Sequence, residues 1–206
     1  INKYKIIVTK STVPVTTGDK IEKIIKKGKN KKIVDIVSNP EFLREGEAIR
    51  DFNFPDRIIV GTDSVKANKM LKNLYEPLIK KGGKYLNTSR RGAELIKYAS
   101  NSFLATKISF INEIANLCEK TNVNIEDISI GMGLDARIGS RFLRAGPAYG
   151  GSCFPKDTRA LVHIGRQIKE PLLILEGVEK MNDRQKIRVI KILERQLKGP
   201  LKKKKI

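Results

Sequence analysis

The first part of the chain changes repeatedly between the two-residue alternation of a strand and the three- to four-residue spacing of a helix. Short runs rich in β-branched residues predict strands at Lys5 to Thr9, Ile33 to Val37 and Arg57 to Gly61, with a further short strand at Lys84 to Leu86. Helical spacing predicts one helix after Thr17 and another from about Ser64, whose hydroxyl can cap it, through Leu78. This alternation is typical of a parallel α/β sheet, of which the chain holds only a part.

After Thr88 the pattern becomes almost entirely helical. Apolar residues recur at three- and four-residue steps from Ala93 to Cys118, which predicts one long buried helix that runs to about Lys120. Further helices are expected over about 124–133, 156–168 and 172–197. The long helix is apolar on more than one face, at positions such as Phe103, Ile111 and Ile114. A helix of this kind is buried both in its own domain and against a partner, so we expect a homodimer.

The composition is that of a globular protein. With 206 residues, of which 40% are hydrophobic and 31% charged, the chain has enough apolar material for one or two packed domains. Its longest apolar runs fall far short of the roughly 20 residues that cross a bilayer, so we expect no membrane span. The N-terminal apolar stretch is too short for a secretory signal, and we expect the chain to begin in a strand already under way.

Cysteine and histidine usage excludes several kinds of site. Two cysteines, Cys118 in a helical pattern and Cys153 in a glycine-rich turn, make no disulfide framework, so a reducing, cytoplasmic setting is expected. His163 is the single histidine, and no His, Cys and carboxylate cluster has metal-ligand spacing. We therefore expect neither a metal site nor a histidine-based catalytic triad.

The formal net charge of +20 raises the possibility of a nucleic-acid partner. The basic residues, however, are spread along expected helices and loops, aromatic residues make up only 6% of the chain, and no Trp is present to stack on bases. This distribution favours a solvated lysine-rich surface over a nucleic-acid footprint. A polyanionic or nucleotide substrate fits the charge equally well.

The glycine-rich stretch at residues 145–152 interrupts the helical pattern and leads into Cys153. Lys156 and Asp157 follow within one turn of an expected helix. A helix N-terminus and nearby cations favour the thiolate, which is the nucleophilic form of a cysteine. From these residues alone, a reactive nucleophile and a small buried cysteine in a turn are equally good interpretations.

Four segments, taken together, resemble the UDP-glucose dehydrogenase family in order and spacing. They are KSTVPV at 10–15, SNPEFLREG at 38–46, ELIKYASN at 94–101 and YGGSCFPKD at 149–157. The resemblance covers essentially the whole chain and implies NAD-dependent oxidation of UDP-glucose to UDP-glucuronate in two steps. The fold it implies is α/β, the C-terminal part of a Rossmann-like parallel-sheet domain followed by an all-helical central domain with a long connecting helix. The implied bounds are 1–87 for a partial NAD-binding domain, 88–200 for a central dimerisation and catalytic domain, and 201–206 for the start of a C-terminal UDP-binding domain.

The same resemblance implies a set of catalytic residues. Cys153 is expected to form the thiohemiacetal and thioester, Lys97 and Asn101 to stabilise the alkoxide, and Glu41 to activate water held by Thr12. Asp157 is expected to position a water or to orient Lys97. Taken alone, a Lys and an Asn four residues apart on a helix usually form a solvated face, and first-turn glutamates such as Glu41 and Glu45 usually pair with a helix dipole. For these positions the resemblance therefore carries the functional interpretation.

Cofactor and substrate contacts are implied in the same way. NAD is expected to contact Ser11, Thr12, Glu45 and Lys156. UDP-glucose is expected to contact Phe42, Leu43, Arg44, Glu45, Lys97, Asn101, Phe142, Tyr149 and Gly150, with Arg137 reaching the neighbouring subunit's site. An arginine suits that task because its planar fork binds phosphate or carboxylate oxygens in pairs. The chain has no G-x-G-x-x-G after a strand, so the pyrophosphate loop is not within it.

Two other functions stay open at this point. One is a sister dehydrogenase that acts on GDP-mannose or on an N-acetylated UDP-sugar; Phe154-Pro155 and Tyr149 favour UDP-glucose modestly. The other is a basic nucleic-acid-binding protein, whose binding would weaken steeply with salt and would not respond to a cofactor. The expected partners are UDP-glucose and a second copy of the chain, with no nucleic acid and no membrane.

Overall fold

The computed structural model describes residues 3–27 and 33–197. The chain divides into two compact units, Ile1–Ala99 and Ser100–Ile206. The expected start of a further domain at 201–206 lies outside the described residues. Within the described ranges, no helix is both long enough and apolar enough to cross a membrane.

The first unit is built on a four-stranded sheet in the order β1-β2-β3-β4. The strands are β1 (Lys5–Thr9), β2 (Val34–Ser38), β3 (Arg57–Gly61) and β4 (Lys84–Thr88). β1 pairs in parallel with β2 and β3 in parallel with β4, as the sequence predicts. The prediction is wrong for the central pairing, because β2 and β3 are antiparallel and share one pair, Ser38 with Gly61. Both residues end their strands, so the carboxyl ends of the two parallel pairs meet at the middle of the sheet.

The reason for the antiparallel pairing lies in the connection between β2 and β3. A parallel neighbour needs a crossover that returns to the starting end of the sheet, usually with a substantial helix. Residues 39–56 contain only α2 (Ala48–Asn53), a helix of six residues that the sequence analysis did not predict. The chain therefore enters β3 from beyond the carboxyl end of β2.

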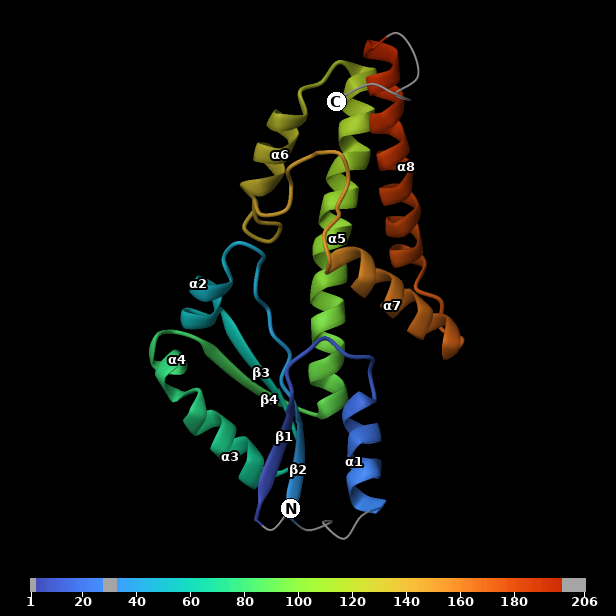
Figure 1. Cartoon of the computed structure of the whole chain (residues 1–206). Coiled ribbons are helices and arrows are strands. Elements are labelled where there is room, and N and C mark those ends of the chain that lie inside the picture. The colour runs from blue at the N-terminus through green and yellow to red at the C-terminus, as the bar shows by residue number, and fades with distance from the viewer. Residues whose placement is uncertain (1–2, 28–32, 198–206) are drawn as a thin grey trace. The chain divides into compact units, whose positions relative to one another are not determined.

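Helices cover the sheet in the first unit, with α3 (Val65–Leu74) and α4 (Glu76–Lys80) on one side and α1 (Thr17–Lys27) on the other (Figure 1). Ser64 caps α3 as predicted, because its Oγ accepts a hydrogen bond from the Ala67 N–H at 3.1 Å. The single helix expected through Leu78 is instead two helices, α3 and α4. Pro77 explains the break, because its ring has no N–H and clashes with the carbonyl four residues earlier.

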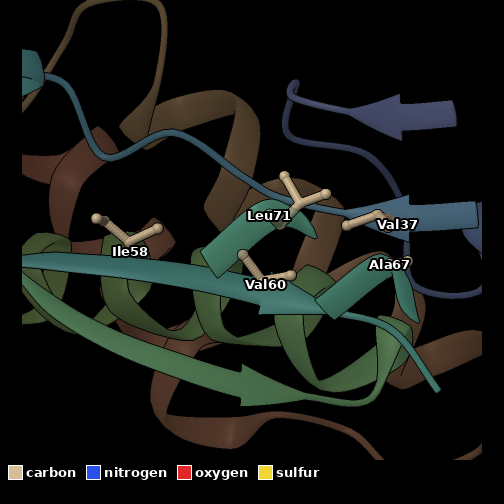
Figure 2. Packing of buried hydrophobic residues seen from close by; sticks show 5 residues of the cluster. All are labelled: Val37, Ile58, Val60, Ala67 and Leu71. Atoms are coloured by element: carbon tan, nitrogen blue, oxygen red, sulfur yellow. The ribbon is translucent and has the colours of Figure 1, made fainter. Parts of the chain in front are cut away.

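The core of this unit forms where α3 packs on the strands. Val37, Ile58, Val60, Ala67 and Leu71 are buried together there (Figure 2). Alternate positions of β3, Ile58 and Val60, belong to this cluster, as expected when every second side chain of a strand points to the same face. This packing fixes the strand ends from which the candidate site residues project.

The second unit is helical, as predicted. The long α5 (Arg90–Thr121) begins in the first unit and continues into the second, followed by α6 (Ile125–Gly133), α7 (Phe154–Gln167) and α8 (Leu173–Gln196). Asn124 caps α6 by accepting from the Glu126 N–H at 3.0 Å. A small core of Ala105, Tyr149 and Val178 joins α5, the glycine-rich loop and α8. The fold class predicted from the sequence, a partial α/β sheet followed by helices with one long connecting helix, is thus confirmed.

Candidate functional site

The loops that follow β1 and β2 leave the sheet side by side. Asn39 N–H donates to the carbonyl of Thr9 at 2.9 Å, which continues the parallel ladder one residue past the strands. Ser11 is exposed and Thr12 half-buried in the loop after β1. Within the described part of the chain, neither hydroxyl has a hydrogen-bond partner, so both are available to a polar ligand. The carboxyl ends of strands in open α/β sheets are where dinucleotides bind, and these two hydroxyls fit the acceptor oxygens of such a cofactor.

Lys97 and Glu41 form a pair at the end of β2. The Lys97 Nζ lies 3.5 Å from Glu41 Oε1, and the lysine is only 3% exposed. Glu41 is further fixed because its Oε2 accepts from the Leu43 N–H at 2.6 Å. Burial of an ammonium is costly unless a carboxylate pairs with it, so the location of Lys97 depends on Glu41. The structure thus brings together the residues predicted as the alkoxide stabiliser and the base.

The Phe42 ring lies next to the same pair. Its centroid is 5.1 Å from the Lys97 Nζ and 4.1 Å from the Arg57 guanidinium carbon, so two cations face one aromatic ring. Burial lowers the pKa of Arg57. Arg57 belongs to β3 and was not predicted as a site residue, since an arginine at the start of a strand carries no distinguishing signal in a basic chain.

Other predicted substrate contacts in this segment lie on the surface. Leu43, Arg44 and Glu45 are exposed. The Arg44 guanidinium binds Asp51 through both Nε and Nη2, and this side-chain hydrogen bonding lowers the pKa of Asp51 to about 2. Residues 41–47 are not helical, so the first-turn helix pairing considered for Glu41 and Glu45 does not occur.

Glu94 is a buried carboxylate that the sequence analysis named only as part of a motif. It is 3% exposed and accepts three hydrogen bonds, from Thr16 N–H at 2.7 Å, Gly18 N–H at 2.8 Å and Ser38 Oγ at 2.9 Å. The two amides belong to the N-terminus of α1, where a negative charge is stabilised by the helix dipole. One side chain on α5 therefore holds both the loop after β1 and the end of β2.

The close approach at this point depends on a glycine. A Cβ at Gly18 would lie 3.2 Å from Glu94 Oε1 and 3.1 Å from Ser38 Oγ, tighter than ordinary contacts. Thr16, just before it, has a φ of 82°, which β-branched residues rarely adopt. A residue keeps such an unfavourable φ where neighbouring groups stabilise it, and the hydrogen bond from Thr16 N–H to Glu94 stabilises it here.

Cys153 occupies the N-cap of α7 in the second unit. Its carbonyl accepts from the Asp157 N–H at 2.9 Å, and its Sγ lies 3.6 Å from Ser152 Oγ. The thiol is half-buried and unpaired. This is the helix start that the sequence analysis expected around Cys153.

Asp157, one turn into α7, is held at both carboxylate oxygens. Asn101 Nδ2 donates to Oδ2 at 2.6 Å, and Lys156 Nζ lies 2.7 Å from Oδ1. Asp157 is 1% exposed and Asn101 is 7% exposed, whereas more than half of the Lys156 side chain is accessible. The predicted residues Asn101, Lys156 and Asp157 thus form one cluster at the start of α7.

Two aromatic residues predicted to line the nucleotide pack around Phe154. The Phe154 ring makes edge contacts with Phe142 and Tyr149, with centroids 6.2 Å and 6.1 Å apart. Tyr149 is 5% exposed, and burial raises the pKa of its hydroxyl. Gly150, the next residue, is exposed. Tyr149 therefore has a packing role beside Cys153, whatever it contacts in a ligand.

Buried side-chain amides, which the sequence analysis did not single out, form hydrogen bonds to the backbone of the loop before Cys153. Asn182 Oδ1 accepts from Tyr149 N–H at 2.8 Å, and Asn182 Nδ2 donates to the Tyr149 carbonyl at 3.1 Å. Gly146 N–H donates to Asn112 Oδ1 at 2.7 Å, and Gln185 Nε2 donates to the Gly146 carbonyl at 3.0 Å. We call Asn112, Asn182 and Gln185 the amide clamp. Polar amides on the apolar faces of α5 and α8 are the signal that could have found it.

The remaining predicted residues lie apart from these clusters. Arg137 follows α6, with 90% of its side chain exposed, and binds Asp135 through Nε at 3.0 Å and Nη2 at 2.6 Å. This hydrogen bonding lowers the pKa of Asp135. Cys118 is buried and His163 is exposed, in keeping with packing and surface roles. Across residues 3–27 and 33–197, no group of three or more His, Cys, Asp or Glu side chains is placed to hold a metal ion.

Comparison with known proteins identifies the family. Residues 1–79 match the NAD-binding domain of the UDP-glucose/GDP-mannose dehydrogenase family, and residues 91–184 match the central domain of the same family. UDP-glucose 6-dehydrogenase of Rhizobium meliloti is 52% identical over 185 residues, which are 89% of this chain and 42% of the relative. The corresponding enzyme of Rickettsia felis is 50% identical over 207 residues, covering 100% of this chain and 46% of the relative.

The solved structures agree. A UDP-glucose dehydrogenase from Pyrobaculum islandicum superposes with a TM-score of 0.89 at 37% identity, over 96% of this chain and 45% of that one. A GDP-mannose dehydrogenase from Pseudomonas aeruginosa superposes with a TM-score of 0.62 at 27% identity. The chain therefore spans less than half the length of the relatives it matches. The two matched domains and the fold show that this chain belongs to the UDP-glucose/GDP-mannose dehydrogenase family.

Proposed function

We propose that the protein containing this chain oxidises UDP-glucose to UDP-glucuronate with NAD, through a covalent intermediate on Cys153. The observation that carries the proposal is the location of Cys153 at the N-cap of α7, one turn before the buried cluster of Asp157 and Asn101. Relatives about half identical to the chain bear the name UDP-glucose 6-dehydrogenase, which supports this substrate. When bound, NAD accepts one hydride in each of two oxidations. Ser11, Thr12, Glu45 and Lys156 are the residues of this chain assigned to hold it.

The proposed chemistry begins after the first oxidation has produced an aldehyde at carbon six of the glucose. The Cys153 thiolate adds to the aldehyde carbon, forming a carbon–sulfur bond and an oxyanion that takes up a proton as a thiohemiacetal. Lys97 and Asn101, one turn apart on α5, are assigned to donate hydrogen bonds to this oxygen. Loss of a hydride from carbon and a proton from oxygen then leaves a thioester.

Hydrolysis of the thioester completes the proposed reaction. Glu41 takes a proton from a water that Thr12 holds, and the water oxygen bonds to the thioester carbon. The carbon–sulfur bond breaks, the Cys153 thiolate leaves, and the product is a carboxylate. The ion pair between Glu41 and Lys97 supports this assignment, because it keeps the base and the oxyanion stabiliser next to each other at 3.5 Å.

We also propose a homodimer formed along α5. Phe103, Phe110 and Leu117 are exposed apolar side chains at seven-residue intervals on this helix, with exposures of 65%, 46% and 58%. A seven-residue apolar repeat forms a continuous seam that a second helix can cover. Arg137, exposed beyond α6, is the residue assigned to the neighbouring copy's site. Both cysteines are unpaired thiols, in keeping with a cytoplasmic setting. Sedimentation of the complete protein as a monomer at micromolar concentration would refute the dimer.

The test of the function is an assay of NAD reduction by the complete protein with different nucleotide sugars. We expect two NADH for each UDP-glucose consumed, with GDP-mannose and N-acetylated UDP-sugars turned over far more slowly. Faster turnover of one of those sugars would assign the chain to the sister activity. Absence of NADH with every sugar, together with salt-sensitive binding to arbitrary nucleic acid, would instead favour the nucleic-acid-binding function.

A further inference from the structure

The glycine-rich loop before Cys153 holds a strained backbone. Ala148 has a φ of 118° and Gly151 a φ of 77°, so Tyr149 lies between positions of left-handed backbone. Alanine rarely adopts such a φ, and strained residues persist where neighbouring groups over-determine them. The loop therefore needs support from elsewhere in the unit to keep one conformation.

The amide clamp supplies that support. Asn182 bonds to both the N–H and the carbonyl of Tyr149, as a neighbouring strand would, at 2.8 Å and 3.1 Å. The backbone of Gly146 is bound at both groups as well, its N–H by Asn112 and its carbonyl by Gln185. Asn116 Nδ2 in turn donates to Gln185 Oε1 at 2.9 Å and fixes the Gln185 amide. The clamp amides are buried, with exposures of 1% for Asn112, 3% for Asn182 and 7% for Gln185. Buried hydrogen bonds to backbone are costly to lose, since each leaves an unsatisfied polar group.

A short chain of contacts leads from the clamp to the thiol. Asn182 fixes the backbone of Tyr149, whose ring packs with Val178 and Ala105 and meets Phe154 edge-on at 6.1 Å. Phe154 is the first residue of α7, directly after Cys153. A continuous set of contacts thus connects Asn182, through Tyr149, with the residue that follows Cys153.

We infer that Asn182, assisted by Gln185 and Asn112, is a positioning residue that sets the location of the Cys153 thiol. The inference rests on the proposed function, since Cys153 is the nucleophile only in that proposal. It assigns to α8, which holds none of the predicted catalytic residues, the task of aligning the thiolate with the substrate aldehyde. Misplacement of a reacting atom by about 1 Å can lower a rate about a hundredfold, so loss of the clamp should affect turnover more than binding.

The test uses Asn182→Leu in the complete protein, a change that removes both hydrogen bonds and keeps the number and branching of the side-chain heavy atoms. We expect kcat to fall at least about tenfold with KM within about threefold of wild type. In parallel, iodoacetamide labelling resolved by peptide mass spectrometry should show Cys153 reacting at least about threefold faster, because the segment that leads into the half-buried thiol is no longer held in one conformation. Cys118, buried on α5, should stay unlabelled and serves as an internal measure of folding.

Ser109→Ala is the matched control. Ser109 is 3% exposed and its Oγ donates to the Val178 carbonyl at 3.5 Å, so this variant loses a buried contact between α5 and α8 without touching the loop. It should keep wild-type turnover and wild-type labelling of Cys153. Should Asn182→Leu fail to fold, Gln185→Leu removes the bond to Gly146 and the bond from Asn116 but keeps both Asn182 bonds to Tyr149, so it should give a smaller change in the same direction.

The outcomes separate the inference from the function on which it rests. Wild-type labelling of Cys153 in the Asn182 and Gln185 variants would overturn the inference. Equal rises in labelling of Cys118 and Cys153, or the same effects in Ser109→Ala, would also overturn it, because the residue would then serve general stability. Faster labelling of Cys153 with unchanged turnover would support the clamp and contradict the catalytic role of Cys153.

Discussion

Replacement of Glu94 by alanine should destabilise the first unit severely. The carboxylate accepts from Thr16 N–H, Gly18 N–H and Ser38 Oγ, and the protein offers these donors nothing in its place. An unsatisfied buried donor costs about 1–3 kcal/mol, and hydrogen bonds to charged groups lie toward the upper end. For three donors, with water reaching the half-buried Thr16, the loss should be about 4 kcal/mol, a large part of the stability of a typical domain.

Urea unfolding followed by circular dichroism at 222 nm measures this loss. Glu94→Gln keeps one acceptor oxygen but turns an amide NH2 toward a backbone donor. The free energy of unfolding should therefore fall about half as far as in Glu94→Ala. Glu76→Ala is the control, because Glu76 lies on the surface of the same unit and, among the residues that the structure describes, pairs with Lys80 alone. The urea midpoint of this variant should not move. A loss below about 1 kcal/mol for Glu94→Ala would refute the reasoning, since the three hydrogen bonds would then contribute no more than one ordinary bond.

Other predictions test the site and its supports. Lys97→Ala in the complete protein should lower turnover about a hundredfold with little change in UDP-glucose binding, measured by steady-state kinetics, because the alkoxide it stabilises forms only during the reaction. Asp19→Asn should lower the free energy of unfolding at pH 7 by about 1 kcal/mol. Hydrogen bonding from Arg91 and Arg90 holds the pKa of Asp19 below 3.8, so this stability is present above that pH and should vanish as acid titration protonates the native carboxylate. Ala148→Gly should raise the unfolding free energy by about 1 kcal/mol in thermal denaturation, because glycine adopts the φ of 118° without strain.

Local structure was largely predictable from the sequence. The strands Lys5–Thr9 and Arg57–Gly61 were predicted with their observed bounds, because β-branched runs stand between clear turn signals. The Ser64 cap was recognisable from residue type and place. The antiparallel pairing of β2 with β3 was missed, because it depends on the connection at 39–56, whose one short helix was not apparent from the sequence pattern.

The side-chain clusters show a similar division. Lys97 and Asn101 have the spacing of a solvated helix face, yet the structure buries both. The resemblance to a family pointed to them where spacing could not. Glu94 and Asn182 were missed because their partners lie 76 and 33 residues away in the chain, and only the fold brings such groups together. A buried polar residue in an amphipathic pattern is the one sequence signal they share.

The central claim is that Cys153 carries the covalent intermediate, and the rate of UDP-glucuronate formation by the complete protein with Cys153→Ala tests it most directly. The thiol acts only after the first oxidation, so the variant should bind UDP-glucose and NAD nearly as wild type does. Product should nevertheless form about a thousandfold more slowly, because no nucleophile remains to trap the aldehyde. Near-normal production of UDP-glucuronate by Cys153→Ala would contradict the thioester mechanism and leave Cys153 as a packing residue at the start of α7.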